Sequence, residues 1–105
     1  MIVTFEKEYL QNLYEKGKSG DKKHRFQPEI VRKYQICIRY LLGASCIEAL
    51  LPINSLNYEV LKGDKVGVSS IRVNNQYRIE FTVTKQGTES VVTVCNVLEL
   101  SNHYK

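Results

Sequence analysis

The chain has 105 residues, a length that suits a single hydrophobic core, so we expect residues 1–105 to form one domain. Hydrophobic residues make up 43% of it, aromatic residues 10% and charged residues 25%, a balance that excludes a disordered or fibrous protein. Its 15 Lys and Arg against 11 Asp and Glu give a formal net charge of +4, which is compatible with a polyanionic partner but does not require one.

We expect neither a secretory signal nor a membrane span. An acid, Glu6, follows the first apolar residues, and the longest uncharged apolar stretch, residues 40–47, is far shorter than the ~20 residues of a membrane-spanning helix. The cysteines show no CxxC spacing, and only two histidines could join them, so we expect no zinc site, no disulfide framework and no cofactor. The sequence therefore predicts a cytoplasmic protein with three small, buried thiols: Cys37, Cys46 and Cys95.

The N-terminal half predicts a strand and two helices. Residues 1–5 are β-branched and aromatic, which is typical of a short strand. Apolar side chains then recur at helical spacing, and this first helix is expected to end near Gly17, where glycine can adopt the left-handed C-cap conformation. The polar residues 17–27 predict a loop, and Pro28 suits the first turn of a second helix that runs to about Ala49.

The C-terminal half changes to a period of two, which is typical of strands. We expect strands at residues 66–73, 76–84 and 90–100, joined by polar links as an antiparallel meander. Helices that precede a run of strands indicate an α+β fold, with both helices packed on one face of the sheet.

The first hairpin of this meander has a defined register. Residue 71 must face residue 79 if the apolar side chains of both strands are to share the core face. The loop is then residues 74–76, a common length in which an asparagine can take a left-handed conformation. The same register places Arg72 directly opposite Arg78 on the other face.

Two opposed arginines favour an anion site. Like charges opposite each other cost stability, so Arg78→Ala is expected to stabilise the fold slightly, whereas two planar guanidinium groups are well suited to bind a phosphate or carboxylate. The alternative is a solvated face on which Glu80 and other acids neutralise the arginines. Lys62 and Lys65, in the turn before the hairpin, either join this phosphate-binding site or only increase solubility.

The last predicted strand leads to the same face. Its apolar residues are expected to face the core: Val92, Val94, Leu98 and Leu100. Glu99, Ser101 and His103 would then point to the arginine side. His103 is a candidate general acid or base, because imidazole titrates near neutral pH; the alternative is a frayed C-terminal tail.

Further cations lie in the predicted loop and second helix: Lys22, Lys23, Arg25, Arg32, Lys33 and Arg39. They could follow a nucleic-acid backbone, dock an acidic partner or form an ordinary solvated helix face. Three tyrosines nearby, Tyr34, Tyr40 and Tyr58, could stack on bases or pack in the core.

The motifs of the C-terminal half resemble those of a known family. The chain reads L-K-G at residues 61–63, S-I-R-V-N at 70–74 and Q-Y-R-I-E-F at 76–81. This is similar to the HigB-like branch of the RelE/ParE toxin superfamily, whose members often read L-K-G, S-I-R-V-N and Q-[WY]-R-I-x-F at this spacing. Residues 98–105 are similar to the family's short last strand with its Tyr/His tail. The close resemblance covers residues 57–105, and the N-terminal half agrees in its order of strand and helices.

The resemblance implies two helices on a small twisted sheet, and a toxin that cleaves messenger RNA on the ribosome without a metal. In that reaction a ribose 2′-OH attacks the adjacent phosphate. It also implies a helix-turn-helix, HigA-like antitoxin that forms a hetero-oligomer with the toxin. Carried over by position, Lys62 and Arg72 would bind phosphate, Arg78 would stabilise the transition state, and His103 or Tyr104 would handle the proton.

Departures from the family pattern leave alternatives open. The family commonly ends with Tyr before His, whereas His103 precedes Tyr104 here, and strand alternation allows only one of the two on the active face. Tyr77 stands where many relatives have tryptophan. The alternatives are a non-nucleolytic toxin like the ParE branch, which poisons DNA gyrase, and an inactive relative that only binds its antitoxin.

Overall fold

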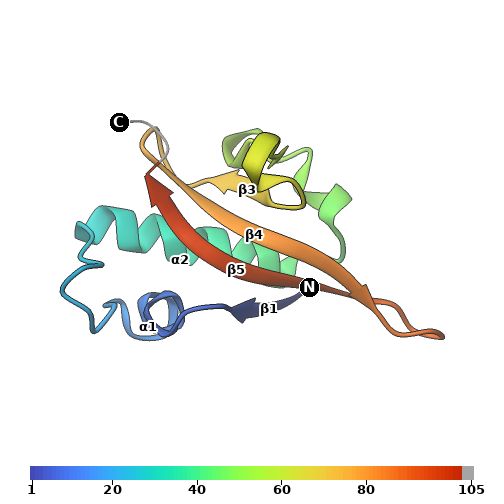
Figure 1. Ribbon diagram of the computed structural model, residues 1–105, viewed down its shortest axis with the longest axis horizontal. Coiled ribbons are helices and arrows are strands. Elements are labelled where there is room, and N and C mark those ends of the chain that lie inside the picture. The colour runs from blue at the N-terminus through green and yellow to red at the C-terminus, as the bar shows by residue number, and fades with distance from the viewer. Residues whose placement is uncertain (103–105) are drawn as a thin grey trace.

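The computed structural model describes residues 1–102 and has two helices on one face of a five-stranded sheet (Figure 1). Along the chain, the helices and strands are β1 (Ile2–Phe5), α1 (Glu8–Lys16), α2 (Pro28–Gly43), β2 (Glu59–Val60), β3 (Ser69–Arg72), β4 (Tyr77–Gln86) and β5 (Val92–Asn102). Short 3-10 turns lie between α2 and β3, at Ile47–Leu50, Asn54–Leu56 and Gly63–Lys65. The predicted α+β class is confirmed.

The strands are arranged in the order β1-β5-β4-β3-β2. The predicted antiparallel meander of β3, β4 and β5 is confirmed. Two features were not predicted. β2 is a two-residue edge strand antiparallel to β3, and β1 pairs in parallel with β5, from Ile2↔Val94 to Phe5↔Val97. β5 therefore lies between the first strand of the chain and β4.

The first helix ends as predicted. Gly17 has φ 76°, the left-handed region, and its backbone N–H donates to the Leu13 carbonyl at 3.2 Å. The buried face of α1 consists of Tyr9, Leu10 and Leu13. This face packs against α2, where the fully buried Tyr34 hydroxyl donates to the Leu10 carbonyl at 2.8 Å.

The second helix begins at Pro28 as predicted, but it ends at Gly43 rather than near Ala49. After Gly43 the backbone becomes extended and then forms 3-10 turns, because Leu50 and Leu56 from this linker are buried in the core. A continuous helix would have carried these two leucines past the sheet.

The core lies between the helices and one face of the sheet. The helices contribute Leu10, Leu13, Tyr34, Ile38 and Leu41, and the strands contribute Ile71, Ile79, Phe81, Cys95 and Val97. Burial of this apolar set provides most of the driving force for folding. The opposite face of the sheet, which the helices leave uncovered, carries the other residues of each strand.

A β-bulge interrupts the pairing of β4 with β5. Glu80 pairs with Glu99, but the next residue of β4, Phe81, pairs with Val97. Leu98 is therefore an extra residue without a partner on β4, and it shifts the alternation of β5 by one position.

This shift corrects the predicted faces of β5. Before the bulge the core-facing side chains are Thr93, Cys95 and Val97, so the prediction that Val92, Val94 and Leu98 face the core is wrong. After the bulge Leu100 is buried in the core as predicted, and Glu99 and Ser101 lie on the uncovered face.

Candidate active site

The β3–β4 hairpin places two arginines side by side on the uncovered face of the sheet. Arg72 pairs with Arg78, and Ile71 pairs with Ile79, which confirms the predicted register. Directly paired residues project to the same side of a sheet, so both guanidinium groups lie on the face opposite the core.

The hairpin loop is closed by a side chain rather than by a left-handed residue. Asn74 Oδ1 accepts hydrogen bonds from the backbone N–H groups of Gln76 (2.9 Å) and Tyr77 (2.7 Å). No residue of this loop has a positive φ, so the prediction of a left-handed asparagine is wrong. The asparagine carbonyl forms the turn instead and fixes the start of β4 next to Arg78.

Arg78 is bound to a buried carboxylate. Its Nε donates to Glu80 Oε2 at 3.0 Å, and its Nη2 lies 2.9 Å from the same oxygen. Lys65 contacts both Glu80 oxygens, with Nζ–Oε1 at 2.8 Å and Nζ–Oε2 at 2.7 Å. The Glu80 side chain is only 5% exposed, compared with 15% for Arg78 and 44% for Lys65. The three side chains form a compact ion network.

The sequence allowed two interpretations of the arginine pair: an anion site, or a solvated face on which acids neutralise the arginines. Neither interpretation describes this network fully. Glu80 does neutralise Arg78, but the pair is buried rather than solvated. Lys65 contacts Glu80, while Lys62 is exposed at the residue before the Gly63–Lys65 turn. Arg72 is exposed, and no acidic side chain within residues 1–102 forms an ion pair with it.

Arg72 also lines a pocket of about 440 Å³ at the edge of β3. Lys33 and Tyr40 of α2 line the same pocket, and no acidic residue does. The Cys37 thiol donates to the Arg72 carbonyl at 3.6 Å, and burial raises the pKa of Cys37 to about 12, so the thiol stays protonated. The pocket is thus shared by Arg72, by the ring of Tyr40 and by Lys33, which itself pairs with Glu29 at 3.3 Å.

The end of β5 runs past the arginines as predicted. Ser101 pairs with Arg78, and Glu99 pairs with Glu80. His103 and Tyr104, the predicted proton-transfer residues, lie outside the residues that the structure describes.

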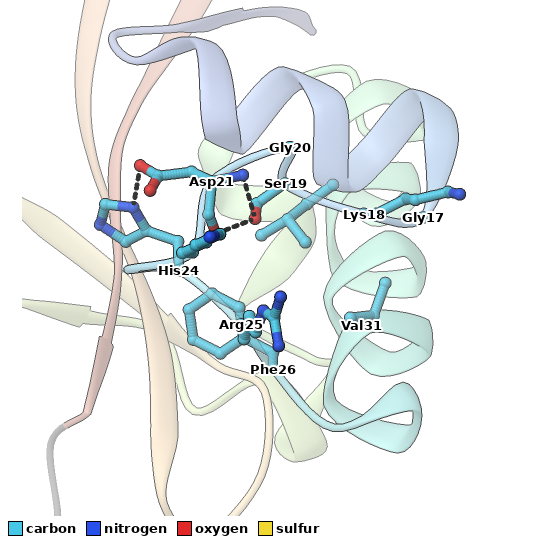
Figure 2. Close-up of a pocket in the computed structure, with 11 residues that line it drawn as sticks. Gly17, Lys18, Ser19, Gly20, Asp21, His24, Arg25, Phe26 and Val31 are labelled. Atoms are coloured by element: carbon cyan, nitrogen blue, oxygen red, sulfur yellow. Dashed lines mark hydrogen bonds and ion pairs between the residues drawn. The ribbon is translucent and has the colours of Figure 1, made fainter.

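The loop between α1 and α2 lines another pocket, of about 400 Å³ (Figure 2). His24 Nδ1 lies 2.9 Å from Asp21 Oδ2, and Figure 2 shows the imidazole turned toward this carboxylate. The His24 ring also stacks on Tyr9, with ring centroids 3.7 Å apart, which holds the loop against α1. Phe26 packs edge-on against Tyr77 at 5.5 Å and brings the end of the loop to the start of β4.

The predicted basic face does not gather around the arginine pair. Arg32 and Arg39 are exposed on α2, on the side away from the sheet, because Tyr34 and Ile38 of the same helix face the core. The exposed loop cations are Lys22, Lys23 and Arg25. Of the six residues, Lys33 alone also lines the Arg72 pocket.

The three tyrosines that the sequence analysis placed near the loop and helix cations have different environments. Tyr34 is buried in the core, and the Tyr58 hydroxyl lies 2.9 Å from Ser69 Oγ, with its ring tilted against Phe81. Tyr40 is 41% exposed, so it is the one of the three with a ring face available to a ligand.

The uncovered face is suited to bind a phosphate and to stabilise negative charge on it. A guanidinium group held in one plane donates to phosphate oxygens in a fixed direction, and a second cation opposite it increases the local potential. Within the described range, no group of three His, Cys, Asp or Glu side chains is arranged to hold a metal ion, and no helix has the length and apolar composition needed to cross a bilayer.

Comparisons with known proteins identify the family of the chain. The model of a family described as a RelE-like toxin of the type II toxin–antitoxin system HigB matches residues 3–94. The match includes the N-terminal half, where the sequence motifs had supported only the order of elements. Toxin HigB-1 of Vibrio cholerae serotype O1 is 35% identical over 82 residues, which cover 77% of this chain and 82% of that protein.

The fold is similar to that of a solved structure. The solved structure of a YoeB/ParE toxin from Agrobacterium tumefaciens superimposes with a TM-score of 0.57, covering 99% of this chain and 100% of that chain at 19% sequence identity. At this identity the likeness concerns the fold, whereas the family match and the relative from Vibrio cholerae establish the affiliation. The chain belongs to the HigB-like family of RelE-like toxins from type II toxin–antitoxin systems.

Proposed function

We propose that this toxin is an endoribonuclease that cleaves messenger RNA on the ribosome. The observation that carries the proposal is the opposed pair of Arg72 and Arg78, with Arg78 held by Glu80, on a sheet face that the helices leave uncovered. Membership of the HigB-like family supports it.

The proposed reaction is attack of a ribose 2′-OH on the adjacent phosphate. The 2′-O–P bond forms and the P–O5′ bond breaks, which leaves a 2′,3′-cyclic phosphate and a 5′-OH. Arg78 would stabilise the charge that builds up on the phosphate, and Arg72 and Lys62 would bind the phosphate group. His103 or Tyr104 would take the proton from the 2′-OH or supply the one that the leaving O5′ needs.

A toxin of this family has a cognate antitoxin as partner. We propose that this antitoxin is a HigA-like helix-turn-helix protein, and that toxin and antitoxin form a hetero-oligomer in the cytoplasm. The loop and α2 cations, which are mostly exposed, provide a surface for the ribosome or for acidic segments of the antitoxin.

Primer extension on cellular messages after induction of the toxin tests the proposal. We expect cuts within translated frames, and we expect these cuts to disappear with Arg78→Ala. Comparing His103→Ala with Tyr104→Ala identifies the residue that handles the proton. Growth arrest without cuts would favour a gyrase-poisoning toxin. If induction caused neither arrest nor cuts, the chain would be an inactive relative that binds its antitoxin.

A further inference from the structure

Glu80 occupies an unusual place for an acid. It lies in the middle of β4 on the uncovered face, yet its side chain is only 5% exposed. Its neighbours across the sheet are Ser70 on β3 and Glu99 on β5, so a second carboxylate is close by. A buried charge costs stability unless it is paired, and apolar side chains in place of a buried ion pair are often neutral or stabilising. Stability alone therefore does not explain the ion pair as a whole, although an acid beside Arg78 is favourable once the arginine is present.

The contacts of Glu80 give a different reason. One oxygen, Oε2, accepts from Nε of Arg78 at 3.0 Å and lies 2.9 Å from Nη2, so the guanidinium is held along one edge. A guanidinium group has five N–H donors. The contact with Glu80 uses one N–H of Nε and one of Nη2. The opposite edge, formed by Nη1 and the second N–H of Nη2, is the bidentate fork that fits a phosphate.

Lys65 completes the arrangement from a separate segment. Its Nζ contacts both oxygens of Glu80, at 2.8 and 2.7 Å, so the carboxylate itself cannot rotate freely. Arg72 lies directly opposite Arg78, and the two positive charges repel each other. The charge of Glu80 offsets this repulsion before any substrate arrives.

We propose that Glu80 is the positioning residue of this site: its buried carboxylate fixes Arg78 by one edge, so that the other edge is already aimed at the substrate phosphate. The inference rests on the proposed function, because it assumes that Arg78 acts on the scissile phosphate. Glu80 acts through Arg78 and does not touch the RNA. Its negative charge weakens phosphate binding somewhat, while the fixed position of Arg78 increases the rate.

Glu80→Gln separates these two effects. Glutamine has the same shape but one acceptor oxygen, and its NH₂ group would face either Lys65 or Arg78. We expect kcat for ribosome-dependent cleavage to fall about 10- to 100-fold, because a small misplacement of a catalytic group has effects of that size. KM should be equal to or lower than that of the wild type, because a negative charge near the phosphate is gone. The matched control is Glu89→Gln, which removes the same charge from the exposed turn after β4.

A second variant keeps the test valid if Glu80→Gln folds poorly. Glu80→Asp keeps the negative charge beside Arg78 and Lys65 but shortens the side chain by one methylene, so we expect a smaller loss of stability while the carboxylate no longer holds the edge of Arg78 and kcat is still reduced. Loss of stability with normal kcat at a temperature where the variant is fully folded would show that Glu80 has only a structural role, and would overturn the inference.

A direct readout does not depend on cleavage. In ¹⁵N NMR spectra the Nε–H signal of Arg78, assigned by its absence in Arg78→Lys, should be protected from exchange in the wild type and in Glu89→Gln but not in Glu80→Gln. Titration with inorganic phosphate should shift this signal in the wild type. If the wild type cleaves no message but the signal behaves as expected, the proposed function fails and the positioning by Glu80 stands. Equal protection in Glu80→Gln, or kcat within twofold of the wild type, would refute the inference.

Discussion

The cations on the two sides of this protein differ in how they are held. On the uncovered sheet face, a single buried carboxylate fixes Arg78 and Lys65. On the outer side of α2, Arg32 and Arg39 are exposed and form no ion pair with any residue in the range 1–102. A fixed cation stabilises charge at one point, whereas a mobile one contributes to a long-range field that salt screens. The total charge of the chain therefore says little about where its chemistry takes place.

The largest effect is expected on the uncovered sheet face, from Arg78→Ala. Arg78→Ala should reduce cleavage about 10²- to 10³-fold, as loss of one donor to the transition state does in other enzymes. It should also destabilise the fold by about 1–3 kcal/mol, because Glu80 loses a buried charged partner. This reverses the expectation from the sequence, which considered only the repulsion by Arg72. Steady-state kinetics and urea unfolding measure both effects, with Arg39→Ala as the control; an increase in stability would contradict the importance of the Glu80 contact.

Arg72→Ala is expected to have an intermediate effect of a different kind. Arg72 is exposed and forms no ion pair within the described residues, so its loss should raise KM about tenfold and leave kcat nearly unchanged. Removal of the like charge opposite Arg78 should leave the free energy of unfolding unchanged or slightly higher. A fall in kcat as large as that of Arg78→Ala would mean that the two arginines act as equals.

Changes on the outer side of α2 should be smaller and sensitive to salt. The double variant Arg32→Ala, Arg39→Ala should raise KM for ribosomes about two- to threefold at low ionic strength, and the difference should vanish at high salt. The kcat at saturating ribosome concentration should not change. KM measured at two salt concentrations tests this, and a salt-independent loss would indicate a direct contact with a defined partner group.

The smallest expected effect is a difference in how fast the three cysteine thiols are alkylated. Cys37 and Cys95 are buried as predicted, and burial raises the pKa of both thiols, whereas the prediction that Cys46 is buried is wrong. Because alkylation needs the thiolate, iodoacetamide at neutral pH should modify half-exposed Cys46 and leave the other two intact until the protein is unfolded. Mass spectrometry of native and denatured samples counts the labels. Rapid labelling of Cys37 would mean that α2 separates readily from β3.

The arginine hairpin could be predicted residue by residue because its information is local. A period of two, a short polar loop and two apolar sets that must share a face leave one register, and this register puts Arg72 opposite Arg78. The burial of Glu80 could not be predicted in the same way, although its face could. Glu80 contacts Lys65, which comes from a separate segment of the chain, and the alternation within β4 carries no information about such a contact.

The other errors have a similar origin. In β5 both alternation phases contain apolar residues, Val92 and Val94 in one and Cys95 and Val97 in the other, so the pattern cannot reveal a bulge at Leu98. The end of α2 at Gly43 is determined by the burial of Leu50 and Leu56, which is a tertiary effect. Periodicity identifies a strand but not its partner, so the parallel pairing of β1 with β5 was not predicted.

That parallel pairing also determines when the protein can fold. Thr4 on β1 and Asn96 on β5 form a hydrogen bond across 92 residues of sequence, and β5 is the strand between β1 and the arginine hairpin. Synthesis proceeds from the N-terminus, so a growing chain presents α1, α2 and the hairpin before it has the strand that joins them. The closure of such a long loop is also entropically costly and slow. A nascent chain that does not yet include β5 therefore cannot join β1 to the arginine hairpin or complete the five-stranded sheet.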